Sequence, residues 1–150
     1  MLSGRLVQTI ETHWYEITAR VLRQIRDNPE LSHVRQLPES ELRDWAYLIL
    51  KNLDHWLSSS KEDEMARRYE WLGHVRFEES VPLHEAVRAL YLLKDGMFAY
   101  LHEQDVVKTS VHLYAEEELE LRIGRFFDGL VYHLIRGYEN ALRKAAHLTA

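Results

Sequence analysis

The sequence has no cysteine, and it has few of the residues that usually interrupt helices. Without cysteine the chain can form no disulfide, no thiolate metal site and no cysteine nucleophile. Only three prolines and six glycines occur in 150 residues, which is too few turn residues for a domain built from short strands. Apolar residues follow helical spacing rather than the period of two that is typical of strands, so the pattern predicts an all-α chain.

Long apolar runs and basic clusters are also missing. No run approaches the roughly 20 apolar residues that a helix needs to cross a bilayer, and the polar start of the chain does not match a signal peptide. Acidic residues outnumber basic ones by 24 to 19, and the densest basic spots, Arg67–Arg68 and Arg143–Lys144, are two residues long. Because phosphate backbones require a basic face, we expect no nucleic-acid partner. Because no apolar run is long enough and no signal peptide is recognised, we also expect no membrane partner and a cytoplasmic location.

The composition that remains is that of a globular protein, with 46% apolar and 29% charged residues. Its length fits a single domain over residues 1–150. The apolar stripes predict five helices, separated by connectors at Glu30–Leu37 and Gln104–Ser110. These helices are expected over about Gly4–Asp27, Pro38–Trp56, Lys61–Phe77, Pro82–Glu103 and Val111–Ala146.

The last predicted helix is too long for the domain. At 1.5 Å per residue it would measure roughly 50 Å, whereas the diameter expected for a chain of this size is roughly 30 Å. Either Gly124 or Gly129 breaks the helix, or one end protrudes and favours a partner. Gly96, inside the fourth helix, indicates either a close approach of two helices or a kink.

Histidines are the residues that invite a metal or haem interpretation. The nine histidines are scattered over the helices, and the Glu-x-x-His spacing of di-iron bundles occurs once, at Glu30–His33, in a connector. The sequence therefore predicts no metal site and no cofactor, with histidines at the surface or hydrogen-bonded in the core. A haem needs only one axial histidine, so a haem or other small-ligand sensor stays an alternative, with His84, His102 and His112 as candidate ligands.

No motif indicates catalysis. The sequence lacks a Gly-x-Ser-x-Gly elbow, a glycine-rich phosphate loop and a dinucleotide fingerprint. The acidic run Glu116–Glu118, together with Glu120, lies near the start of the last helix, where it matches the helix dipole and is expected to form a solvated face. We therefore expect no catalytic residues and no enzymatic activity.

Adjacent apolar residues on the first and last helices indicate stripes that are too wide for one core. Neighbouring residues of a helix point about 100° apart, so both members of a pair such as Phe126–Phe127 do not easily face the same core. Two explanations stay open, a homodimer interface and burial between two neighbours within the chain. The residues expected at such an interface are Leu6, Val7, Ile10, Phe126, Phe127, Leu130 and Leu134.

Four segments together follow the pattern of a known family. They are Leu37–Asp44 (LPESELRD), Arg67–Phe77 with its Leu72–Gly73 pair, Leu83–Lys94 (LHEAVRALYLLK), and the long closing helix. Over about Trp14–Leu142 the chain resembles the N-terminal sensory domain of RsbR-type stressosome proteins, the RsbT co-antagonist N-terminal domain.

This resemblance implies both a fold and a role. The implied fold is a globin-like helical bundle of five or more helices with a long C-terminal helix, usually without haem and assembled as a homodimer. The implied role is that of a non-catalytic sensory or interaction domain in bacterial stress-response signalling. Such a domain would relay a signal through its C-terminal helix to a downstream output domain or signalling protein. The family supplies no catalytic residues.

Overall fold

The computed structural model describes residues 2–58, 61–104 and 109–149, and every regular element within them is helical. Two short 3₁₀ turns, Pro29–Leu31 and Val34–Gln36, occupy the first predicted connector, whereas residues 105–108 of the second lie outside the described residues. The all-α class and the long C-terminal helix predicted from the sequence are confirmed. The α-helices are α1 (Leu2–Thr12), α2 (Trp14–Asp27), α3 (Glu39–Leu50), α4 (Leu53–Leu57), α5 (Glu62–Glu78), α6 (Leu83–Glu103) and α7 (Ser110–Thr149).

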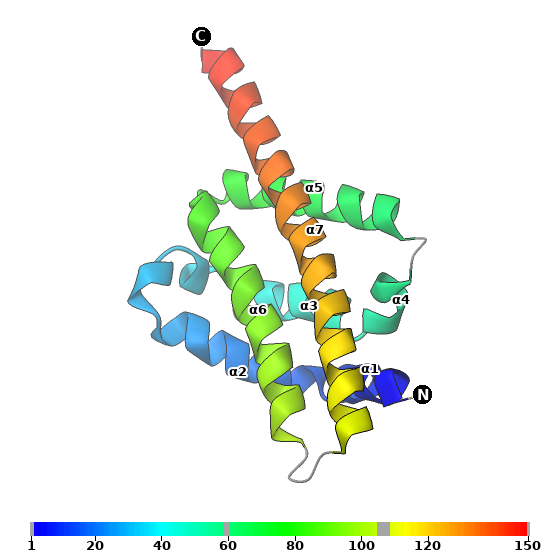
Figure 1. Ribbon diagram of the computed structural model, residues 1–150. Helices are drawn as coiled ribbons and strands as arrows, with labels where there is room; N and C mark the ends of the chain where they lie inside the picture. The colour runs from blue at the N-terminus through cyan, green and yellow to red at the C-terminus, as the bar shows by residue number, and fades with distance from the viewer. Residues whose placement is uncertain (1, 59–60, 105–108, 150) are drawn as a thin grey trace.

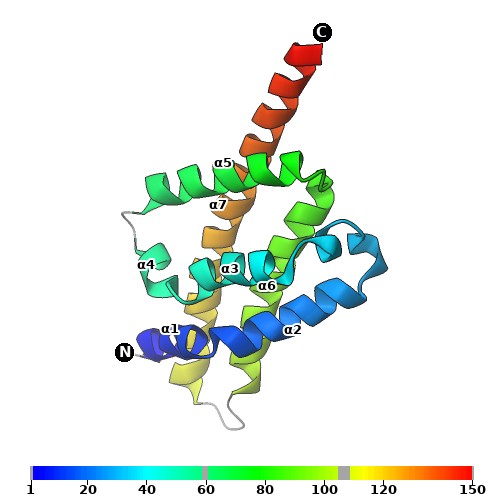
Figure 2. The same cartoon turned by 180° about the vertical axis from the view of Figure 1, so that it is seen from behind.

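The helices are arranged as an antiparallel pair, α6 and α7, laid over the other five. In Figure 1 this pair lies nearest the viewer, and in Figure 2 the reverse side shows α2, α3 and α4 in front. Helix α7 makes its most extensive contact with α5, which crosses it, and α6 packs on both α7 and α2. The C-terminal end of α7 projects beyond α5 in both views.

The core follows the apolar stripes of α6 and α7. Leu90, Leu93 and Met97 of α6 are buried, and so are Leu119, Ile123, Phe127, Leu130 and Leu134 of α7, at positions three and four residues apart. Each such side chain contributes about 1.5–3 kcal/mol through removal of its apolar surface from water. The predicted stripes of these two helices therefore form the centre of the bundle.

Helix α7 is continuous through both glycines that could have interrupted it. Its 40 residues give a rod roughly 60 Å long. Of the two alternatives that the sequence left open, the helix therefore protrudes at one end and is not broken at Gly124 or Gly129. A glycine inside a helix costs about 1 kcal/mol relative to alanine. The burial of Ile123, Phe127 and Leu130 beside these glycines outweighs that cost.

Two predicted helices are each divided in two, and at both breaks a side chain contacts the backbone carbonyl one turn back. The first is interrupted at His13, whose Nδ1 atom lies 2.9 Å from the Thr9 carbonyl oxygen that the His13 N–H also reaches. The second is interrupted at Lys51–Asn52, where the Asn52 side-chain amide donates to the Leu48 carbonyl. Such local hydrogen bonds offer the backbone an alternative to the helix.

Helices α5 and α7 cross with their backbones in contact at two glycines. A Cβ atom built at Gly137 would overlap the carbonyl of Glu70, with the Glu70 Cα atom only 2.7 Å away. A Cβ atom at Gly73 would overlap the Leu134 carbonyl and lie 2.7 Å from the Tyr138 nitrogen. Because real Cβ atoms do not approach backbone so closely, only glycine fits either position.

A third glycine, Gly96, lies where α6 closely approaches another helix, which is one of the two explanations that the sequence left open. A Cβ atom at Gly96 would lie 2.7 Å from the Val21 Cγ2 atom of α2. The tryptophans differ in burial. Trp45 and Trp56 are buried, but Trp71 is 65% exposed on α5, because the side of α5 that carries it faces away from α7.

Candidate functional site

The three histidines proposed as haem ligands do not share one location. His84 is exposed in the first turn of α6, whereas His102 is exposed in the last turn of the same helix. His112 is half-buried in the first turn of α7. His84 therefore cannot serve the same haem as the other two.

Among the hollows bordered by core residues, one of about 330 Å³ lies between Trp56, Met65 and Phe126, and two others are smaller. The first of these two, between α3, α4 and α5, has a volume of about 180 Å³ and is lined by Trp45, Trp56 and Trp71 among others. The second lies between Trp45, Leu90 and Leu134 and measures about 10 Å³. Sites for drug-sized ligands usually occupy about 300–1,000 Å³. Neither small hollow is lined by a candidate haem ligand, whereas His84 lines a hollow of about 670 Å³ that is open to solvent on the surface of α6.

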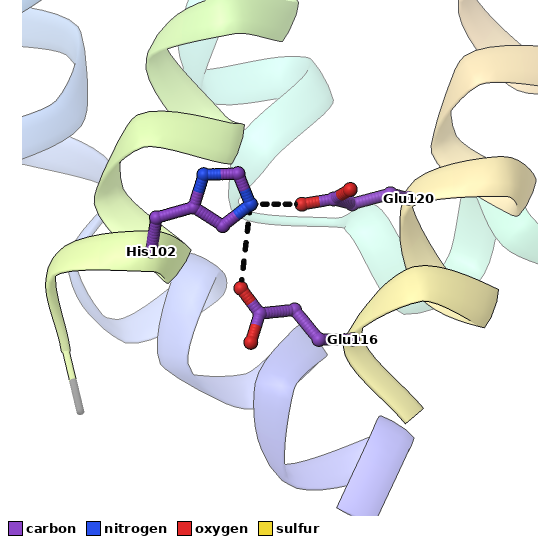
Figure 3. Close-up of side chains that lie close together, drawn as sticks. All are labelled: His102, Glu116 and Glu120. Carbon is purple, nitrogen blue, oxygen red and sulfur yellow. Dashed lines mark hydrogen bonds and ion pairs between the residues drawn. The ribbon is translucent and has the colours of Figure 1, made fainter. Parts of the chain in front are cut away.

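Three side chains with metal-binding atoms converge where α6 ends and α7 begins (Figure 3). The His102 Nε2 atom lies 3.4 Å from Glu116 Oε1 and makes a shorter contact with Glu120 Oε1. One ligand atom from each residue can be chosen so that all lie within 4.8 Å of one another. Within residues 2–58, 61–104 and 109–149 no other group of three or more such side chains comes together.

The three members of this cluster differ in exposure. The Glu116 side chain is only 5% exposed, Glu120 is 25% exposed, and His102 is 58% exposed. The cluster therefore has a buried carboxylate at its base and an imidazole that solvent reaches. The prediction of a solvated acidic face is confirmed for Glu117 and Glu118 but is wrong for Glu116. The reason is that Glu116 and Glu120 are four residues apart and share the edge of α7 that faces α6.

Sequence reasoning missed this cluster because its members lie on two helices. The sequence shows no local metal-binding spacing, since His102 precedes the connector and both glutamates follow it. The signal that was available is a Glu-x-x-x-Glu step early in one helix together with a histidine in the last turn of the preceding one. An antiparallel helix pair brings such positions to the same end of the bundle.

A different buried carboxylate, Glu85 of α6, serves the fold. Its oxygens accept hydrogen bonds from the backbone N–H groups of His33 (2.9 Å) and Val34 (3.1 Å) and from the His33 imidazole (2.8 Å). Burial acts to raise the pKa of the Glu85 carboxyl, but these hydrogen bonds outweigh burial, and the pKa lies below its ordinary value. The carboxylate thus holds the second 3₁₀ turn against the start of α6.

The seven residues expected at a dimer interface are all buried within one protomer. Phe127, Ile10 and Leu130 are fully buried, and Phe126 stacks on Trp56 with ring centroids 6.4 Å apart. Helix α7 has neighbours on several sides, since it contacts α1, α4, α5 and α6. The wide stripe is therefore occupied by contacts within the chain. The full set is Leu6, Val7, Ile10, Phe126, Phe127, Leu130 and Leu134.

Other apolar side chains of α6 and α7 are partly or well exposed, and Leu83, Val87 and Val131 among them also pack against the core. In Figure 1 no described helix lies in front of the α6–α7 pair. On α7 the residues lie at helical steps that place them on one face; on α6 they border an open hollow that Ile135 of α7 also lines. Leu121 is 64% exposed and Leu142 is 51% exposed. We call this surface the α6–α7 face: Leu83, Val87, Tyr91, Leu121, Val131, Ile135 and Leu142.

Among the described helices, none combines the length and the apolar character needed to span a membrane. Comparisons with curated proteins and with solved structures found no match. The sequence model of one family, the RsbT co-antagonist protein rsbRD N-terminal domain, matches residues 15–150, which include helices α3–α7 and all but one residue of α2. The family suggested by the sequence segments is confirmed, and the chain belongs to the RsbT co-antagonist protein rsbRD N-terminal domain family.

Proposed function

We propose that the chain is a non-catalytic sensory or interaction domain of stress-response signalling in the cytoplasm, which acts as a homodimer and passes a signal along α7. The family match over residues 15–150 supports the signalling role. The observation that carries the proposal for assembly is the α6–α7 face, whose apolar side chains are partly or well exposed.

The shape of the α6–α7 face favours a second copy of the same chain as its occupant. Two antiparallel helices form it, so two copies related by a twofold axis would build a four-helix bundle. Exposed charges of both signs border the apolar residues, among them Arg88, Asp128 and Glu139, so a symmetric contact can pair opposite charges across its rim. We propose that dimerisation uses this surface rather than the seven buried residues of the first and last helices.

Helix α7 is the element that we propose carries the signal. It belongs both to the α6–α7 face and to the crossing with α5, and its end projects beyond the bundle (Figure 2). Beyond Ala141 the described side chains of α7 are exposed or half-buried, with Leu148 at 87% exposure. A partner that binds this end would sense any change in how two copies of α7 pack.

Replacing Ile135 with glutamate should convert the dimer to a monomer. A charge placed at the centre of an apolar interface raises the dissociation constant by roughly 30-fold or more. Analytical ultracentrifugation at micromolar concentration should show a dimer for the original chain and a monomer for Ile135→Glu. Leu142→Glu, at a half-exposed position on the same face, should shift the equilibrium in the same direction without touching the core.

The matched control is Trp71→Glu, which introduces the same charge at an exposed apolar residue of α5, away from the α6–α7 face. This variant should stay dimeric, and circular dichroism should show that all variants keep their helix content. A monomeric original chain, or a dimer that Trp71→Glu dissolves and Leu142→Glu leaves intact, would contradict the proposed interface.

A further inference from the structure

We propose that His102, Glu116 and Glu120 form a binding site for a divalent transition metal, with Zn²⁺ as the best-matched ion. The three residues come from the last turn of α6 and the early turns of α7, and Figure 3 shows both carboxylates turned toward the same imidazole nitrogen. This proposal is independent of dimerisation, because it concerns one end of the helix pair in a single chain.

The first argument concerns the number of protons at the centre of the cluster. The Nε2 atom of an imidazole carries at most one proton, yet Glu116 and Glu120 both approach the Nε2 atom of His102. One N–H group cannot make two well-directed hydrogen bonds at once. A metal ion between the three side chains would accept a lone pair from each of them.

The second argument concerns charge and burial. Two carboxylates side by side repel each other, and both approach the same imidazole nitrogen. Glu116 is buried, and the energy of a charge held away from water depends strongly on a nearby opposite charge. A divalent cation between the two carboxylates would remove their mutual repulsion, and the exposed His102 ring lies on a side that solvent ions can reach.

The third argument concerns distances and the type of ligand. Bonds of about 2.0–2.1 Å in a tetrahedral zinc site place the ligand atoms roughly 3.4 Å apart. The distance from His102 Nε2 to Glu116 Oε1 is 3.4 Å, and all three ligand atoms lie within 4.8 Å of one another, so small side-chain rotations complete the site. An imidazole with two carboxylates suits Zn²⁺ better than Mg²⁺ or Ca²⁺, which prefer oxygen alone; water would fill the fourth position.

Isothermal titration calorimetry with Zn²⁺ tests the site directly. The original chain should bind one Zn²⁺ per protomer at micromolar concentration or more tightly, and the ion should raise its melting temperature. His102→Ala and Glu116→Gln should each weaken binding by at least about tenfold, since even partners outside the metal shell cost about 10–100-fold. Co²⁺ should give the visible absorption of a tetrahedral site in the original chain but not in His102→Ala or Glu116→Gln.

The control variant is His74→Ala, which removes a histidine that contacts a single carboxylate, Glu78, at 2.9 Å. It should bind Zn²⁺ as the original chain does, and Mg²⁺ should shift the melting temperature of none of these proteins. Failure of the original chain to bind Zn²⁺ would overturn the proposal. Equal Zn²⁺ affinity of His102→Ala and His74→Ala would overturn it as well.

Discussion

Replacing Gly137 with alanine is expected to lower the free energy of unfolding by roughly 3 kcal/mol, although alanine is the better helix former. The new methyl group would overlap the Glu70 carbonyl of α5, and its neighbour is backbone rather than a side chain that could turn aside. The two helices would have to separate along their most extensive contact. Gly73→Ala should have a similar effect, because its methyl group would meet the Leu134 carbonyl of α7.

Gly124→Ala is the matched control for these variants. It lies on the same helix as Gly137, but a Cβ atom there would have no heavy atom of the surrounding protein within 4 Å. The substitution should therefore raise the free energy of unfolding by up to about 1 kcal/mol. Urea denaturation monitored by circular dichroism gives the free energy of unfolding of all three variants. Equal stability of Gly137→Ala and Gly124→Ala would show that the two helices are not in backbone contact.

Replacing Glu85 with alanine is expected to cost about 3 kcal/mol. The change leaves the backbone N–H groups of His33 and Val34 and the His33 imidazole without their acceptor, and each buried donor that loses its partner costs about 1–3 kcal/mol, less where water enters. Glu103→Ala is the control at the other end of α6. Its carboxylate pairs with Arg20 at the surface, where an ion pair contributes at most about 1 kcal/mol.

The same carboxylate predicts a dependence of stability on pH. Because the folded state lowers the pKa of Glu85 below its ordinary value of 4.5, folding favours the ionised form. The stabilisation is complete above the ordinary pKa and is lost as the pH falls through the lowered one. Glu85→Gln, which cannot ionise, should lose less stability than the original chain when denaturation is compared at about pH 6 and about pH 3. An identical loss in both proteins would contradict this role.

The parts of the fold that sequence alone predicted are those governed by spacing along one helix. The stripes of α6 and α7 depend only on apolar residues three and four positions apart, so their extent and their buried faces could be derived from the sequence. The interruptions at His13 and Asn52 could not, because apolar spacing continues through both. At each of them a side chain contacts a carbonyl one turn back, which is a local feature that apolar spacing does not reveal.

The parts that the sequence did not predict depend on pairs of residues far apart in the chain. Gly73 and Gly137 acquire their role only when α5 and α7 cross, and either glycine alone looks like an ordinary weak point in a helix. Glu116 was expected in solvent because acidic residues surround it, yet its position on α7 turns it toward His102. The candidate site therefore required the packing of the helix pair to be known.

The glycine crossing has a mechanical consequence for the far end of α7. Side chains can absorb small displacements by changing rotamer, whereas two backbones in contact cannot, so movement of α5 must be transferred to α7. The stretch from Gly137 to Thr149 is roughly 18 Å long at the helical rise. A tilt of about 10° about the crossing would swing the tip by roughly 3 Å, so the crossing would act as a fulcrum and the projecting end as the long arm of a lever.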